Sequence, residues 1–173
     1  MARNVEIKAR VSDLSPVRAR VRALASGPAE VLVQRDTFFL VPKGRLKVRE
    51  FSDGSGELII YERGDRQGPK ESVYTRVPCE DAGALTSALG GVLRVRGVVD
   101  KRREVFLIGR TRVHLDEVNL LGSFVELEVV LAPEEAVERG SREADELLRL
   151  LQIPEAALIA GAYIDLLETV RRA

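Results

Sequence analysis

Charged and apolar residues alternate along most of the segments that the sequence predicts as strands. Near the N-terminus, Glu6 and Lys8 share one face of the chain, whereas Val5 and Ile7 share the other. Because successive side chains of a strand point to opposite sides, this period of two predicts one charged face and one apolar face. Later segments repeat the pattern, with charged faces that include Arg45, Lys47 and Arg49; Tyr61 and Arg63; Lys70, Ser72, Tyr74 and Arg76; Lys101 and Arg103; Arg112, His114 and Asp116; and Glu126 and Glu128.

Two arrangements of a sheet satisfy this pattern. In an open antiparallel sheet, the charged face would be exposed to water and helices would cover the apolar face. In a closed sheet, the charged face would point inward, and isolated charges in a dry interior would each cost about several kcal/mol. A closed sheet therefore needs a water-filled lumen or a ligand of matching charge. The cations outnumber the acids on these faces, which suits a polyanion accompanied by a divalent metal ion.

Turn residues divide the chain into short predicted elements. We expect strands at 4–11, 31–39, 45–51, 57–63, 71–77, 98–108, 111–118 and 123–131. A helix is expected to begin at Ser15-Pro16, with the serine as its cap, and further helices are expected at 80–89, 133–151 and 162–172. Many strands at hairpin spacing with few helices indicate a barrel or a strongly curved antiparallel sheet.

Composition excludes several classes of protein. The chain has 173 residues, which fits a single domain spanning 1–173. Its formal net charge is zero, which argues against non-specific binding to nucleic acid through a basic surface. The sequence contains no long apolar run and no apolar leader, so we expect no association with a membrane. Cys79 is the only cysteine, and a reducing cytoplasm is the expected location.

Several segments also resemble one protein family. Asn4-Val5-Glu6-Ile7-Lys8 resembles the Glu-x-Glu-x-Lys signature that opens proteins of the CYTH superfamily, the relatives of class IV adenylyl cyclase and thiamine triphosphatase. Segments that resemble the later strands and the C-terminal helix of that family follow in the same order, at 34–39, 44–50, 57–63, 112–118, 122–128 and 163–167.

The resemblance implies a mostly β, α+β fold: a closed antiparallel eight-stranded β-barrel, the triphosphate tunnel, with flanking helices. It also implies action on a small-molecule triphosphate with Mg²⁺ or Mn²⁺ as cofactor. The metal ligands implied by the resemblance are Glu6, Asp116, Glu126 and Glu128. The implied phosphate-binding residues are Lys8, Lys47, Arg49, Arg63, Lys70, Lys101, Arg103 and Arg112. Glu6, Lys8, Glu126 and Glu128 are the implied catalytic residues.

The sequence departs from the family pattern at two positions. Asn4 stands where the signature has its first glutamate, and an amide oxygen offers a metal ion no charge, so a second metal ion would be held more weakly. Tyr61 stands near where many tunnel enzymes have a basic residue, and Arg63 is taken as its substitute. His114, the sole histidine, is either a catalytic base or a structural residue of the polar face.

The sequence leaves three activities open. A cyclase would convert ATP to cyclic AMP and pyrophosphate. A phosphohydrolase would cleave tripolyphosphate, thiamine triphosphate or a nucleoside triphosphate. A non-catalytic module would bind polyphosphate, nucleotide or 5′-triphosphorylated RNA, and the weakened metal site at Asn4 is compatible with that alternative. The sequence does not specify the oligomeric state and is compatible with a homodimer.

Overall fold

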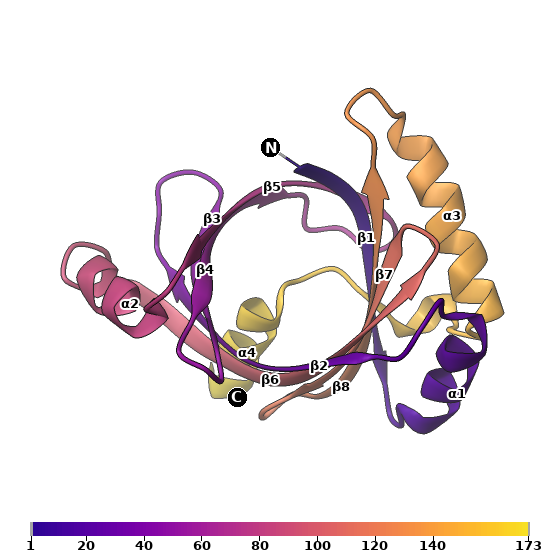
Figure 1. Ribbon diagram of the computed structural model, residues 1–173, viewed down its shortest axis with the longest axis horizontal. Helices are drawn as coiled ribbons and strands as arrows, with labels where there is room; N and C mark the ends of the chain where they lie inside the picture. Colours follow the sequence, from indigo (N-terminus) through magenta and orange to yellow (C-terminus); the bar gives the residue numbers. More distant parts are fainter. Residues whose placement is uncertain (1, 173) are drawn as a thin grey trace.

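The computed structural model describes residues 2–172, in which eight antiparallel strands close into a barrel (Figure 1). The strands are β1 (Ala2–Val11), β2 (Glu30–Phe39), β3 (Arg45–Phe51), β4 (Gly56–Arg63), β5 (Lys70–Cys79), β6 (Val95–Ile108), β7 (Thr111–Val118) and β8 (Gly122–Leu131). Around the barrel they follow the order β5-β4-β3-β2-β6-β7-β8-β1, and pairing of β1 with β5 closes the circle. The predicted barrel is therefore confirmed.

Strand β1 joins the barrel along both of its edges. One edge pairs with β8 from Arg3 to Val11. The other edge pairs with β5 from Ala2 to Glu6 and then with a short additional strand, β9 (Leu158–Ile159), at Lys8 and Ala9. Strand β9 was not predicted from the sequence, because two residues are too few to display a periodic pattern.

Four helices surround the barrel: α1 (Ser15–Leu24), α2 (Ala82–Gly90), α3 (Val137–Leu150) and α4 (Tyr163–Arg172). Figure 1 shows α1 and α3 together on one side and α2 on the opposite side. Helix α4 packs against β6, and residues at its start close one end of the barrel interior. None of the described helices is long and apolar enough to span a membrane.

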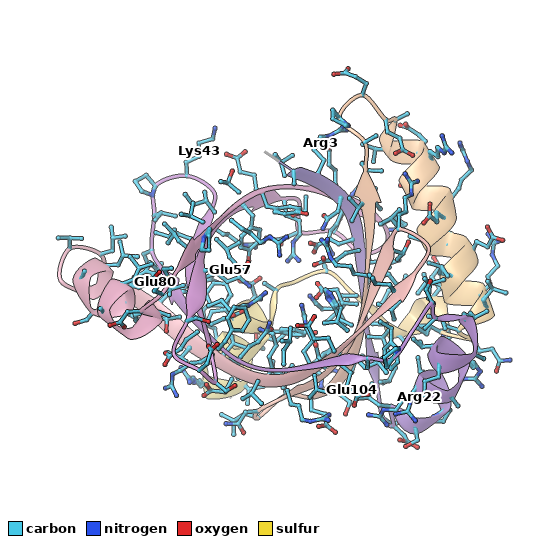
Figure 2. All side chains as sticks on the ribbon, viewed as in Figure 1. Arg3, Arg22, Lys43, Glu57, Glu80 and Glu104 are labelled. Carbon is cyan, nitrogen blue, oxygen red and sulfur yellow. The ribbon has the colours of Figure 1, made fainter. Side chains whose placement is uncertain are left out.

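The apolar faces of the strands point outward, under the helices. Val5, Ile7, Val113 and Leu127 are fully buried and belong to one cluster with Leu147 of α3. Figure 2 shows that side chains also extend from the strands into the barrel. The chain therefore adopts the second of the two arrangements that the alternation allows, with its charged face inside.

The start of α1 corrects one prediction. Ser15 is the first helical residue, and Leu14 occupies the cap position without a side-chain hydrogen bond. Instead, the Asp13 carboxylate accepts a hydrogen bond of 2.8 Å from the Ser15 backbone N–H. Pro16 lies in the first turn as predicted, where the missing proline N–H costs the helix nothing.

Candidate functional site

The barrel encloses a cavity of about 340 Å³, within the range of roughly 300–1,000 Å³ that is usual for ligand pockets. All eight barrel strands contribute residues to its lining. The basic lining residues are Lys8, Lys47, Arg49, Arg63, Arg76, Lys101, Arg103 and Arg112, and the acidic ones are Glu6, Glu30, Asp36, Glu57, Glu126 and Glu128. The two kinds of charge are not mixed evenly within the cavity.

One wall, formed by β2, β3 and β6, carries a group that we call the basic cluster: Asp36, Lys47, Arg49 and Lys101. The Asp36 carboxylate accepts hydrogen bonds from Lys47 Nζ at 2.7 Å, Arg49 Nε at 2.8 Å and Lys101 Nζ at 2.7 Å. The strand register brings these side chains together, because Asp36 lies directly opposite Arg49. A single carboxylate thus balances three cations, which leaves this wall with excess positive charge.

Burial perturbs the titration of the basic cluster. It lowers the pKa of Lys47 to about 8, and the positive charge of Arg49 adds to the effect. Burial also lowers the pKa of Lys101 well below its ordinary value. For Asp36, burial favours the neutral acid, but Arg49, Lys101 and Lys47 together hold its pKa well below the usual range. A bound anionic ligand would raise the pKa of both lysines, because negative charge nearby favours their protonated forms.

The facing wall, formed by β1, β7 and β8, carries the acidic cluster: Glu6, His114, Glu126 and Glu128. Glu6 lies opposite Glu128, and Glu126 lies opposite both Lys8 and His114 in the neighbouring strands. Like charges placed opposite one another on adjacent strands repel and need nearby cations or a bound ion. In this structure, basic side chains of the barrel supply the nearby cations.

Each carboxylate of the acidic cluster pairs with basic side chains. Glu126 accepts hydrogen bonds from Lys8 Nζ at 2.6 Å and from Arg103 Nη2 at 2.8 Å. Glu128 accepts one of 2.7 Å from Arg112 Nη2, and Glu6 accepts one from Arg63. Burial opposes the ionised form of Glu126, yet Lys8, His114 and Arg103 hold its pKa well below the ordinary value.

The acidic cluster fits a divalent cation. One ligand atom each from His114, Glu126 and Glu128 lies within 4.8 Å of the other two. Carboxylate oxygens and an imidazole nitrogen are common metal ligands in proteins. Asn4 also lines the cavity, and its buried Oδ1 has no hydrogen-bond partner among the described residues. This orphan oxygen is a further polar group that a bound ion or substrate would satisfy.

Ten of the twelve predicted site residues line the cavity, and two do not. The ten are Glu6, Lys8, Lys47, Arg49, Arg63, Lys101, Arg103, Arg112, Glu126 and Glu128. Asp116 lies behind Arg103 and accepts two hydrogen bonds of 2.6 Å from its guanidinium. It accepts another of 2.6 Å from the Tyr163 hydroxyl. Both of its oxygens are therefore engaged by Arg103 and Tyr163, and its role as a metal ligand stays a prediction.

Lys70 is the other exception. Its Nζ donates hydrogen bonds to the backbone carbonyls of Arg66, at 3.2 Å, and Ala160, at 3.1 Å. It joins the loop between β4 and β5 to the segment that precedes α4, rather than lining the cavity. Its contact with phosphate stays a prediction.

Asp36 is the principal site residue to which the sequence analysis assigned no role. Its neighbours on the strand face, Gln34 and Phe38, are neutral, and its importance depends on three cations from other strands. The available signal was the presence of a charged residue on a predicted strand whose neighbours on that face are neutral.

Comparison with known proteins identifies the family. The sequence model of the CYTH domain family matches residues 2–163. The chain belongs to the CYTH domain family. A search of curated proteins gave no match.

Solved structures confirm the fold of this CYTH protein. A Pyrococcus horikoshii protein superposes with a TM-score of 0.83 at 21% identity, covering 94% of this chain and 98% of its own. A protein of Vibrio parahaemolyticus, described as a candidate adenylate cyclase, superposes with a TM-score of 0.78 at 20% identity, covering 95% and 97%. A Hippeastrum protein, described as a candidate adenylyl cyclase with a dominant triphosphatase activity, gives 0.64 at 17% identity, covering 92% and 91%.

The basic cluster predicts a large stability loss when its carboxylate is removed. Asp36→Asn should lower the free energy of unfolding by about 3–5 kcal/mol at neutral pH, because it leaves buried cations without their counter-charge. Urea denaturation followed by circular dichroism measures the change. The matched control is Asp100→Asn, whose carboxylate pairs at 3.5 Å with an exposed Arg35 and should cost less than about 1 kcal/mol. Equal losses for the two variants would contradict the assignment.

Proposed function

We propose that this CYTH protein is a metal-dependent triphosphate hydrolase whose reaction takes place inside the barrel. The observation that carries the proposal is the pair of facing walls: an excess of cations around Asp36 on one side, and clustered carboxylates on the other. A triphosphate chain needs the first wall for its oxygens and the second for its accompanying cation. Family membership and the triphosphatase activity described for the Hippeastrum relative support the proposal.

The basic cluster is the proposed cradle for the phosphate chain. Arg49 offers a planar fork suited to phosphate oxygens, whereas Lys47 and Lys101 offer compact charges. Phosphate would compete with Asp36 for these donors. Arg63, Arg103 and Arg112 also line the cavity, where they pair with Glu6, Glu126 and Glu128, and they are the proposed contacts for the remaining oxygens.

Glu126 and Glu128, with Glu6 nearby, are the proposed holders of Mg²⁺ or Mn²⁺. A bound divalent ion would supply positive charge to phosphate oxygens during the reaction. The chain's own contribution is to position the substrate and to surround it with fixed charges, which accounts for most of the catalysis in phosphoryl transfer. Burial strengthens the interactions of these charges, because the effective dielectric constant is lower in a protein interior than in water.

Hydrolysis is favoured over cyclisation by the triphosphatase activity described for the Hippeastrum relative. Charged side chains from both walls match the inorganic part of a substrate, and apolar and aromatic side chains, among them Leu32, Phe38 and Phe51, line the cavity as well. Cyclisation of ATP would additionally require a ribose hydroxyl to be placed beside the α-phosphate. Phosphate release, without cyclic AMP, is the expected product pattern.

Glu128→Gln tests the proposed metal-binding role. Glu128 pairs with Arg112 near the edge of the acidic cluster, whereas Glu126 is shared by two buried cations and its loss would disturb the fold. We expect a loss of roughly a hundredfold or more in Mn²⁺- or Mg²⁺-dependent phosphate release, because charge that stabilises the transition state is removed. The substrate panel is tripolyphosphate, ATP, GTP and thiamine triphosphate, with chelator as the blank.

The matched control is Glu117→Gln, an exposed residue of β7 that pairs loosely with Arg102 at 3.7 Å on the outside of the barrel. It should retain wild-type turnover. Turnover that persists in chelator, or that survives Glu128→Gln, would contradict metal-dependent hydrolysis at this site. Cyclic AMP as the main product from ATP would replace the hydrolase with a cyclase.

The pKa of Lys47, about 8, predicts a pH dependence of binding. Only the protonated amine attracts phosphate, so affinity for tripolyphosphate should be full at low pH and decline as the pH rises through about 8, by up to about tenfold per unit. Calorimetry in chelator, without turnover, measures the affinity. Lys47→Arg keeps its charge throughout, so the ratio of the two affinities removes the titration of the ligand itself. A flat ratio would show that the charge of Lys47 is not used.

A further inference from the structure

His114 belongs to the acidic cluster, and the proposed phosphate cradle gives it no role. It is the sole histidine of the chain, it is 4% exposed, and it lines the cavity from β7. Its Nδ1 lies 3.5 Å from Glu126 Oε2 and 3.9 Å from Glu128 Oε1. These separations are too long for good hydrogen bonds and leave the imidazole facing two carboxylates.

We propose that His114 is a direct metal ligand, and that with Glu126 and Glu128 it forms a site selective for first-row transition ions over Mg²⁺. This inference rests on the proposed function, which places a metal ion at the acidic cluster. It goes further by naming the class of metal. It also adds a nitrogen ligand to a set that the sequence analysis composed of carboxylates alone.

The geometry favours a shared ion over a direct contact. Ligand atoms about 2.0–2.2 Å from a metal ion stand roughly 3.0–3.5 Å from their neighbours in octahedral or tetrahedral coordination. The observed separations of 3.5 and 3.9 Å lie at or just above that range, and the three ligand atoms, all within 4.8 Å of one another, would contract around the ion. The three residues come from two paired strands, in which His114 lies directly opposite Glu126, so the barrel itself holds them close.

The chemistry of the ligands sets the preference among metals. Mg²⁺ takes oxygen ligands almost exclusively and gives up bound water reluctantly. Imidazole suits transition ions, whose affinity for a site with nitrogen and oxygen ligands rises from Mn²⁺ through Co²⁺ to the later metals. One histidine among carboxylates therefore favours Mn²⁺, Co²⁺ or Zn²⁺ over Mg²⁺.

The cations of the cavity predict a dependence on phosphate. Lys8 and Arg103 donate hydrogen bonds to the Glu126 carboxylate, and Arg112 donates to the Glu128 carboxylate. A metal ion that binds alone must displace them. A polyphosphate that draws these side chains toward its own oxygens frees the carboxylates, so pyrophosphate should strengthen metal binding.

Because His114 is the only histidine, its imidazole gives a single set of resonances in the tag-free protein. Zn²⁺, titrated with pyrophosphate present, should shift the resonance of one imidazole nitrogen in a saturable manner, and Mg²⁺ at the same occupancy should not. Calorimetry should show that His114→Gln weakens Mn²⁺ binding by roughly 10–100-fold while changing Mg²⁺ binding far less. His114→Asp, which supplies a charged carboxylate oxygen in place of a neutral amide, should bind Mg²⁺ better than His114→Gln does.

Imidazole resonances that stay in place while Zn²⁺ binds would overturn the proposal, as would equal losses of Mn²⁺ and Mg²⁺ affinity in His114→Gln. The wild-type titration remains decisive even if His114→Gln fails to fold. Neither measurement requires turnover. Metal ligation by His114 without hydrolysis would contradict the proposed function alone, and hydrolysis without ligation by His114 would contradict this inference alone.

Discussion

Burial of charge inside a closed sheet is the constraint on which the rest of the structure depends. Once β1 pairs with β5, the inward side chains of eight strands share one cavity of about 340 Å³. A charge enclosed there without a partner would be costly, so each carboxylate of the two clusters is paired with basic groups. The same pairs define what a ligand must offer, because only a polyanion with a cation can replace both partners at once.

Helix α4 connects this interior to the outside of the fold. Tyr163, at its first position, donates a hydrogen bond of 2.6 Å to Asp116, which in turn accepts from Arg103, and Arg103 donates to Glu126. This chain of contacts ties the C-terminal helix to the acidic cluster. The position of Glu126 is thus fixed from two sides, by its own strand and by the helix that closes the cavity.

Alternation in the sequence predicted the strands and which of their faces carry charge, because a period of two is local information. β3 and β7 were predicted to the residue. The closure of the sheet is non-local, and its prediction came from the family resemblance; the order of the strands was not predicted. Alternation also could not separate Asp116 and Lys70 from the residues that line the cavity, since sharing a face does not specify a partner. The role of Asp36 was hidden for the same reason: its three cations come from β3 and β6.

The most direct test of the account is a crystal structure of the protein with tripolyphosphate in the presence of chelator. If the basic cluster is the phosphate cradle, one phosphate chain lies inside the barrel, with oxygens about 2.7–3.2 Å from Lys47, Arg49 and Lys101 and with the contacts of these side chains to Asp36 shared or broken. Tripolyphosphate bound only on the outer surface, with the basic cluster unchanged and still closed around Asp36, would contradict it.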